Sequence, residues 1–337
     1  MFLGGLAAAG MSCAIHAEDA KPAPIILGSG EQRYECVHDW GQLPETIAWG
    51  LTHGIAVDKQ SHVYVFHTSR KTNACKDTVV VFDPAGTFVR SFGAEYAGSA
   101  HGFDLVNEDG NEVIYITDMA RGLFKTALDG KVIWHLPKPE FYAGKALKYT
   151  PTNVAVAPDG RVFFADGYGS WFIHRLDKNG KYLGTFGGAG QGDSATIHPH
   201  GLYVDARGKE PLLVLAENDP AGKKPGRLHA FDLDGTHHSY LETPVRSPRH
   251  FDRRENVVVI PDLDAVVTLI DENNKVIAQL GDGFTTMAEV RTLRTKSRDK
   301  FIPGKFVCPH DAAFDRDGSI YVSEWVDVGR VTKLKKV

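Results

Sequence analysis

Several features that would build a membrane protein, a disulfide scaffold or a helical bundle are scarce in this sequence. Among 337 residues there are only 4 cysteines and 4 methionines, too few cysteines for a disulfide framework. Beyond the N-terminus no apolar run is long enough to span a bilayer, and few stretches repeat with a helical period. The formal net charge is -4, which gives no general attraction to nucleic acid or to acidic membranes. What is present, 35 glycines and many short apolar stretches, predicts an all-β protein.

The N-terminal stretch MFLGGLAAAGMSCAIHA is apolar, ends in small residues and is too short to cross a bilayer comfortably. This is typical of a secretory signal peptide cleaved after Ala17, although the basic start is missing, so its true start is open. An unstructured tail is the alternative. We expect a signal peptide over 1–17, a linker over 18–31 and a folded domain over 32–337, in a protein exported to the periplasm or the extracellular space. There Cys36 could pair with Cys75.

One phrase recurs along the rest of the chain. A polar residue opens an apolar strand, a turn with Asp, Asn or Gly follows, and a second strand ends in an acid, as in AHGFDLVNEDGNEVIYITD. Successive phrases begin 48, 51, 48, 49 and 61 residues apart, the last gap holding an apparent loop insertion over 284–306. Six such units predict a six-bladed β-propeller, closed on itself because an open row would leave apolar faces in water. The stretch YECVHDW is expected to close the ring against the C-terminal blade, whereas the rival, tandem β-sandwiches, does not explain the even spacing.

The polar residues that open the phrases should meet at one mouth of the central channel, because the inner strand of each blade lines that channel. They are His53, His101, Thr152, His200, Arg249 or His250, and His310. A histidine before a strand usually makes an ordinary hydrogen bond. Four of them converging in a partly dry channel are costly unless they bind something, and three histidines with an open position form the usual catalytic zinc arrangement. The sequence therefore predicts a metal site.

A second set of polar residues ends the second strands: His67, Asp118, Asp166, Glu217, Asp262 and Glu324. Either these residues face the channel as part of a site, or they are structural ties to neighbouring backbone, and both explanations stay open here.

The repeats resemble NHL repeats, and the chain from about residue 50 to about residue 335 resembles the lyase domain of peptidylglycine α-amidating enzymes. The resemblance rests on AHGFDL, TPTNVAVAPDGRVFFADGYGS, HPHGLYV and CPHDAAFDRDGSIYV. It implies a six-bladed β-propeller built of NHL-type repeats. It also implies an activity, the cleavage of peptidyl-α-hydroxyglycine into a peptide amide and glyoxylate.

Two metals follow from the same resemblance. Zinc would be held by three histidines, His101, His200 and His310. A structural calcium would be bound by the Asp311 carboxylate and by backbone carbonyls near Ile55 and Phe103, which suits the preference of calcium for oxygen ligands.

The resemblance also implies a catalytic tyrosine at Tyr168, acting as the base with a pKa lowered by nearby cations. The position of the family's arginine is Thr68 here, so Arg70 is our first choice for holding a carboxylate, with Arg121 or Arg249 as alternatives. His53, Asp166, Arg249 and Cys308 are expected to border the channel mouth, although Cys308 is equally well explained as a small buried residue.

The predicted function is thus an exported metal-dependent lyase, with a small molecule or peptide as substrate and no nucleic-acid partner. The alternatives are a non-enzymatic NHL propeller that serves as a binding scaffold, and a zinc- or calcium-dependent hydrolase on the same fold. The basic insertion over 284–306 is either a solvated loop or a lid that attracts an anionic substrate. The true substrate and the oligomeric state are left open by the sequence.

Overall fold

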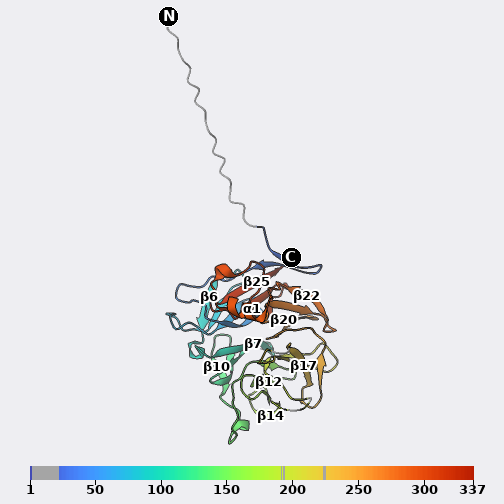
Figure 1. The fold of residues 1–337 in the computed structure, drawn as a ribbon. Helices are drawn as coiled ribbons and strands as arrows, with labels where there is room; N and C mark the ends of the chain where they lie inside the picture. Colours follow the sequence, from blue (N-terminus) through green and yellow to red (C-terminus); the bar gives the residue numbers. More distant parts are fainter. Residues whose placement is uncertain (2–22, 191, 193, 223–224) are drawn as a thin grey trace.

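Six antiparallel sheets surround a central channel in the computed structural model of the chain (Figure 1). The structure describes residue 1 and residues 23–190, 192, 194–222 and 225–337. Each sheet is one blade, with its strands following one another from the channel outwards. The predicted all-β, six-bladed β-propeller is therefore confirmed.

The strands of the first three blades follow the predicted repeat. Blade one has β3 (Thr52–Val57), β4 (Val63–His67), β5 (Val79–Phe82) and β6 (Phe88–Phe92); blade two has β7 (Ala100–Glu108), β8 (Asn111–Asp118), β9 (Gly122–Ala127) and β10 (Val132–Leu136); blade three has β11 (Val154–Val156), β12 (Val162–Ala165), β13 (Phe172–Leu176) and β14 (Tyr182–Gly187).

The last three blades are built in the same way. Blade four has β15 (Pro199–Asp205), β16 (Leu212–Glu217), β17 (Arg227–Asp232) and β18 (His238–Leu241); blade five has β19 (Asp252–Arg254), β20 (Val257–Asp262), β21 (Val266–Ile270) and β22 (Val276–Leu280); blade six has β23 (Pro309–Phe314), β24 (Ile320–Glu324) and β25 (Arg330–Lys336), joined by β2 (Gln32–Val37) and β1 (Ile26–Ser29).

The ring closes where the N-terminal strand β2 pairs antiparallel with β25, placing Tyr34 opposite Lys336. The predicted role of YECVHDW is thus confirmed. Strand β1 pairs with β2 as a fifth strand of blade six, although its residues 26–29 fall in the stretch expected to be a linker. Apart from Met1, the expected signal peptide over 1–17 lies outside the described residues, as does the linker up to residue 22.

The core lies between the blades rather than within one of them. The middle strands are buried on both faces, so the sequence is a continuous apolar run in β5, VVVF, and in β4 up to its last residue, VYVF before His67. Aromatic side chains join neighbouring blades, for example Phe66 of blade one and Phe103 of blade two, whose ring centroids are 5.3 Å apart. This packing holds the inner strands in a fixed register around the channel.

The polar residues that end the second strands tie each blade to the segment entering its own inner strand. The Asp262 carboxylate accepts a hydrogen bond from the Ser247 backbone N–H at 2.8 Å, and Glu324 accepts one from the Val307 backbone N–H at 2.8 Å. The corresponding acceptors in the other blades are His67, Asp118, Asp166 and Glu217. Of the two explanations left open by the sequence, the structural tie accounts for this set.

The insertion before blade six contains the short helix α1 (Met287–Leu293), which Thr286 caps by accepting a hydrogen bond from the Glu289 backbone N–H at 3.2 Å. Its Val290 packs in one cluster with Val307 and Cys308 of blade six. The insertion is thus a packed wall over blades five and six, where Figure 1 shows α1. No helix in the described part of the chain is long and apolar enough to cross a membrane.

The cysteines at positions 36, 75 and 308 are all free. Cys36 packs in a cluster with blade five and blade six residues, whereas Cys75 contacts the cluster that contains Trp40 and Trp49. The disulfide between Cys36 and Cys75 that the export prediction allowed is therefore not formed in this structure.

Candidate metal centre at the mouth of the channel

Four histidines from different blades meet where the inner strands begin. His53, His101, His200 and His310 are all buried. The ring centroid of His101 lies 4.8 Å from that of His200 and 5.3 Å from that of His310, and His200 and His310 are 4.8 Å apart. The ring centroid of His53 lies 4.9 Å from that of His310 and 5.3 Å from that of His101. The predicted convergence is thus found in the structure.

Three of the four imidazoles are clamped to the neighbouring blade. Nδ1 of His101 is 2.7 Å from the Thr152 carbonyl, Nδ1 of His200 is 2.9 Å from the Arg249 carbonyl, and Nδ1 of His310 is 2.8 Å from the His53 carbonyl. A carbonyl can only accept, so each Nδ1 carries the proton and each Nε2 keeps its lone pair. Metal-binding histidines are commonly oriented by such a second hydrogen bond.

His101 and His200 are each followed by a glycine, and sterics explain why. A Cβ at Gly102 would lie 2.4 Å from the Thr152 carbonyl oxygen, and one at Gly201 would lie 2.1 Å from the Arg249 carbonyl oxygen. A side chain there would push the neighbouring blade away and break the clamp on the preceding histidine. The His-Gly pairs of the repeated phrase therefore belong to the site as much as to the fold.

The cluster suits a metal ion. One nitrogen from each of His53, His101 and His310 lies within 4.8 Å of the other two. Nε2 of His200 is buried without a hydrogen-bond partner, as are both ring nitrogens of His53. Burial lowers the pKa of His101 to about 4 and holds the pKa values of His53, His200 and His310 well below the usual range. All four are therefore neutral at pH 7, which is the form that binds a metal.

Two sets of three histidines share His101 and His310. The tighter nitrogen group takes His53 as its third member, whereas the set implied by the resemblance takes His200. The backbone clamps favour the second set, because His200 is held by a carbonyl and His53 is not. The set His101, His200 and His310 remains our prediction on that ground.

Tyr168 lies against the cluster, with its hydroxyl 3.1 Å from Nε2 of His101. Its loop is fixed by Asp166, whose carboxylate accepts hydrogen bonds from the backbone N–H groups of Thr150 and Ser170 at 2.6 and 2.7 Å. Burial raises the pKa of Tyr168, and the Arg249 guanidinium opposes this without reversing it. The expectation of a lowered pKa is thus wrong for the protein alone, because the positive charge of Arg249 does not outweigh the loss of water.

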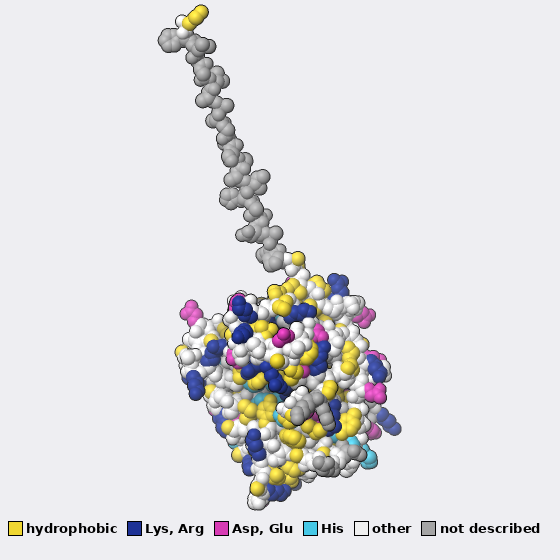
Figure 2. All heavy atoms as spheres, viewed as in Figure 1, with side chains coloured by type: hydrophobic (Ala, Val, Ile, Leu, Met, Phe, Trp, Pro, Cys, Tyr) yellow, Lys and Arg dark blue, Asp and Glu magenta, His cyan; other side chains and the backbone are white. Residues whose placement is uncertain are grey.

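A cavity of about 710 Å³ opens beside the cluster. It lies between the residues that follow β16 of blade four and the insertion over 284–306. Its lining includes four arginines and two acids, so basic side chains outnumber acidic ones: Arg246, Arg249, Arg291, Arg294, Asp219 and Asp264, with His198 and Cys308 beside them. In Figure 2, histidine side chains reach the surface near the middle of the face shown, with lysine or arginine side chains next to them. The cavity is therefore suited to an anionic molecule.

The arginines of this cavity differ in their remaining capacity to bind. Arg246 pairs with Asp282 at 2.7 Å, and Arg294 lies over the Trp325 ring, 3.4 Å from its centroid. Arg249 donates one hydrogen bond to the Ser247 hydroxyl at 3.1 Å, and its Nε is buried without a partner. Arg249 is thus a guanidinium with donors left for a ligand.

Arg70, our first choice from the sequence, lies elsewhere. Its guanidinium donates to the backbone carbonyls of Trp49 and Asp327, the latter at 2.7 Å, and it is not among the residues that line the cavity. Arg121 pairs with Asp118 at 2.8 Å. Of the three arginines named from the sequence, Arg249 is the one that faces the cavity beside the histidines.

Cys308 lines the cavity but is buried and belongs to the apolar cluster under α1. Burial raises the pKa of its thiol to about 12, so it is protonated and unreactive at neutral pH. The explanation as a small apolar residue therefore fits the structure.

The predicted calcium ligand Asp311 is already engaged by protein donors. One carboxylate oxygen accepts from the Ile55 backbone N–H at 3.0 Å, and the other lies 2.5 Å from Nδ1 of His250. Phe103 is buried nearby, with its ring against blade one. Calcium at Asp311 stays a prediction, and it would have to displace His250, whose contact with Asp311 the sequence did not indicate.

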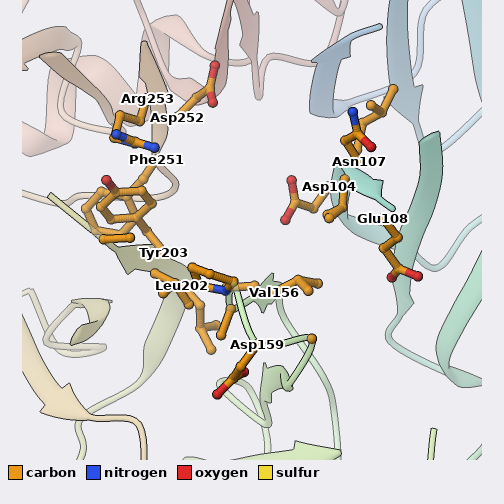
Figure 3. A pocket seen from close by; sticks show the side chains of 18 of the residues that line it. Asp104, Asn107, Glu108, Val156, Asp159, Leu202, Tyr203, Phe251, Asp252 and Arg253 are labelled. Atoms are coloured by element: carbon orange, nitrogen blue, oxygen red, sulfur yellow. The ribbon is translucent and has the colours of Figure 1, made fainter. Parts of the chain in front are cut away.

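A second cavity, of about 470 Å³, lies between the inner strands away from the histidine cluster. Figure 3 shows Asp104 of blade two and Asp252 of blade five at the border of its open space. Burial raises the pKa of Asp104 to about 7 and that of Asp252 to about 6. Both acids lie in inner strands, Asp104 in β7 and Asp252 in β19. A carboxylate at such a position was the sequence signal that could have identified them.

His198 is a further residue that sequence reasoning passed over. Its ring lies 5.0 Å from that of Tyr168, and it lines the cavity beside the cluster. The doubled histidine of HPHG was the available signal, since one of the pair joins the cluster and the other contacts the tyrosine.

Comparisons with known proteins find only distant similarity, over most of the chain. No protein-family profile matches the chain. The chain is 25% identical over 309 residues to peptidyl-alpha-hydroxyglycine alpha-amidating lyase 1 of Drosophila melanogaster, covering 82% of this chain and 55% of that protein. It is 24% identical over 304 residues to peptidyl-glycine alpha-amidating monooxygenase B of Xenopus laevis, covering 82% of this chain and 33% of that protein.

The chain thus spans about half or less of the length of these two relatives. Among solved structures, one described as a candidate gluconolactonase has a TM-score of 0.54 at 14% identity, with 88% of this chain and 94% of that chain covered, which shows the fold alone. The chain is therefore a six-bladed β-propeller with distant similarity to the amidating enzymes over most of its length.

Proposed function

We propose that the chain is an exported, metal-dependent lyase that cleaves a carbinolamide such as a peptidyl-α-hydroxyglycine. The observation that carries the proposal is the set of three neutral imidazoles, each clamped through Nδ1 to the next blade, beside a tyrosine hydroxyl at hydrogen-bond distance. The distant similarity to a protein named as an amidating lyase supports the same reaction.

His101, His200 and His310 would hold the metal. A zinc ion in this place supplies Lewis-acid polarisation of a substrate oxygen. The hydrogen bonds from each Nδ1 to the next blade favour metal binding, because they fix the direction of each Nε2 before a metal binds.

The reaction moves one proton from oxygen to nitrogen. The carbinol O–H loses its proton, a carbonyl forms at that carbon, and the C–N bond breaks with its electron pair going to the amide nitrogen, which takes up a proton. Tyr168 faces the cluster and would act as the phenolate, receiving the first proton at its phenol oxygen and returning it to the nitrogen. Because burial raises its pKa in the metal-free protein, the charge of a bound metal ion would be needed together with that of Arg249 to stabilise the phenolate. His198 packs against the ring of Tyr168 and positions it.

Arg249 would hold the carboxylate of the substrate. Its Nε and remaining N–H groups are free to donate, and a guanidinium can bind a carboxylate through two parallel hydrogen bonds. Its positive charge also opposes the burial effect on the pKa of Tyr168, which helps the tyrosine to lose its proton.

The test is the release of glyoxylate from an N-acyl-α-hydroxyglycine by the zinc-loaded protein. Tyr168→Phe should lower turnover by about 10²–10⁴-fold with metal content and unfolding temperature unchanged. The matched control is Tyr149→Phe, which also removes a buried phenol hydroxyl, one that has no hydrogen-bond partner. Equal turnover in both variants would rule out Tyr168 as the base, and no glyoxylate from the loaded wild type would rule out the lyase.

A further inference from the structure

His53 differs from the three clamped histidines. Both of its ring nitrogens are buried without a hydrogen-bond partner, and the residue is only 5% exposed. A buried polar group left without a partner destabilises the folded state, because it has lost its hydrogen bonds to water and gained none. A neutral ring with two unpartnered nitrogens therefore destabilises the folded state at this position unless a ligand binds it.

The other blades show how this position is satisfied when no metal is involved. Thr152 occupies it in blade three, and its hydroxyl donates to the Pro199 carbonyl at 2.9 Å. Arg249 occupies it in blade five and donates to the Ser247 hydroxyl. His53 stands at the same position in blade one and has neither kind of partner.

What His53 faces is the cluster itself. One of its nitrogens lies within 4.8 Å of the ligand nitrogens of His101 and His310, and its ring centroid is 4.9 Å from that of His310. Its ring contacts within the described part of the chain are with these same two histidines. The unpartnered nitrogen is therefore placed to bind the same ion as the other three.

We propose that His53 is a fourth metal ligand, which closes the position that His101, His200 and His310 leave open. The proposal rests on the metal centre of the proposed function. Metal sites with four protein ligands are typically closed, whereas catalytic sites keep one position for water or substrate. His53 would thus have to leave before a substrate oxygen could bind.

The structure provides for such a departure. His101, His200 and His310 cannot turn without breaking a hydrogen bond to the next blade. No such bond restrains the ring of His53 among the described residues. His53 is therefore the histidine of the cluster that can exchange with a ligand, and it would keep the metal from water while no substrate is bound.

The test is a count of the nitrogen ligands. Zinc X-ray absorption of the wild type should fit four imidazoles, and His53→Thr, which installs the residue that blade three carries at this position, should fit three imidazoles and one oxygen. Competition with a chelator should show zinc held about 10-fold or more weakly by the variant, in the range found for residues that support a metal site. His229→Thr is the matched control, because His229 of blade four is also buried and has a ring nitrogen without a hydrogen-bond partner but lies outside the nitrogen group, and the change should leave both readouts unchanged.

The outcomes separate this proposal from the proposed function. Three imidazoles in both proteins, with equal zinc affinity, would overturn the role of His53 and leave the lyase untouched. Four imidazoles in a protein that releases no glyoxylate would support His53 and refute the lyase. A wild type that binds no zinc would overturn both. The unfolding temperature of each metal-free variant shows whether a loss of zinc reflects the ligand or the fold.

Discussion

Replacing His200 by alanine tests whether His200 is one of the zinc ligands. In the metal-free protein the change removes the hydrogen bond to the Arg249 carbonyl, which contributes about 1 kcal/mol, but it also removes an Nε2 that is buried without a partner at a cost of about 1–3 kcal/mol. These terms have opposite sign. Alanine also leaves a cavity where the buried imidazole was, which costs about 2–5 kcal/mol, so we expect the metal-free variant to be less stable than the wild type.

The effect of zinc is a separate difference, measured for each protein against its own metal-free form. A metal present at about 100 times its dissociation constant stabilises the folded state by about 2.7 kcal/mol. For a chain of this size about 1 kcal/mol corresponds to about 2 °C, so zinc should raise the unfolding temperature of the wild type by about 5 °C. If His200→Ala weakens binding about 100-fold, the same zinc concentration stabilises by about 0.4 kcal/mol, a shift of less than about 1 °C.

The assay is thermal unfolding with and without zinc, together with elemental analysis of each protein after free metal has been removed. The wild type should retain one zinc ion per chain and the variant should lose it. A variant that keeps its zinc and its full thermal shift would refute the argument from the clamps and would favour the group of His53, His101 and His310.

Three further predictions follow from single contacts. Arg249→Gln should raise the KM for a carboxylate substrate by about 10-fold or more, since a hydrogen bond to a charged group contributes about 1.5–3 kcal/mol; an unchanged KM would exclude Arg249 as the carboxylate site. Asp104 has a pKa raised by burial from 3.8 to about 7, so the folded state binds its proton more tightly than the unfolded state, and this residue's contribution to stability falls as the pH rises from about 4 to about 7. Asp104→Asn should therefore be more stable than the wild type towards urea at about pH 8, with the difference disappearing near pH 4, and a difference independent of pH would contradict the assignment. Glu324→Gln should lower the free energy of unfolding by about 3–5 kcal/mol, because it leaves the buried Arg330 without its charge partner, and a loss below about 1 kcal/mol in chemical denaturation would show that the pair is not needed.

Much of the fold can be predicted directly from the repeat in the sequence. Phrases spaced about 48 residues apart predict blades because each phrase is a local unit, two strands and a turn, whose pairing needs no distant information. The closing strand around Tyr34 could be predicted for a related reason, since a closed ring needs one strand from the other end of the chain. The convergence of His53, His101, His200 and His310 then follows from the symmetry of the blades.

What the symmetry cannot supply is the way each side chain is used. The four histidines are equivalent in the repeat, but only the structure distinguishes the three that a neighbouring carbonyl clamps from His53, which has no such clamp. The choice between Arg70 and Arg249 depends on which acceptors lie nearby, and for Arg70 these include the Asp327 carbonyl of blade six.

The number of blades, the order of their strands and the set of residues at the channel mouth could all be predicted from the residues alone, because strand pairing and hydrophobic periodicity are local and repeat along the chain. Three-dimensional packing was needed to establish which nitrogens are free, which arginine faces the cavity and that His250 lies against Asp311. Those outcomes depend on contacts between residues about 50 or more positions apart, where small differences in packing rather than pattern select the partner.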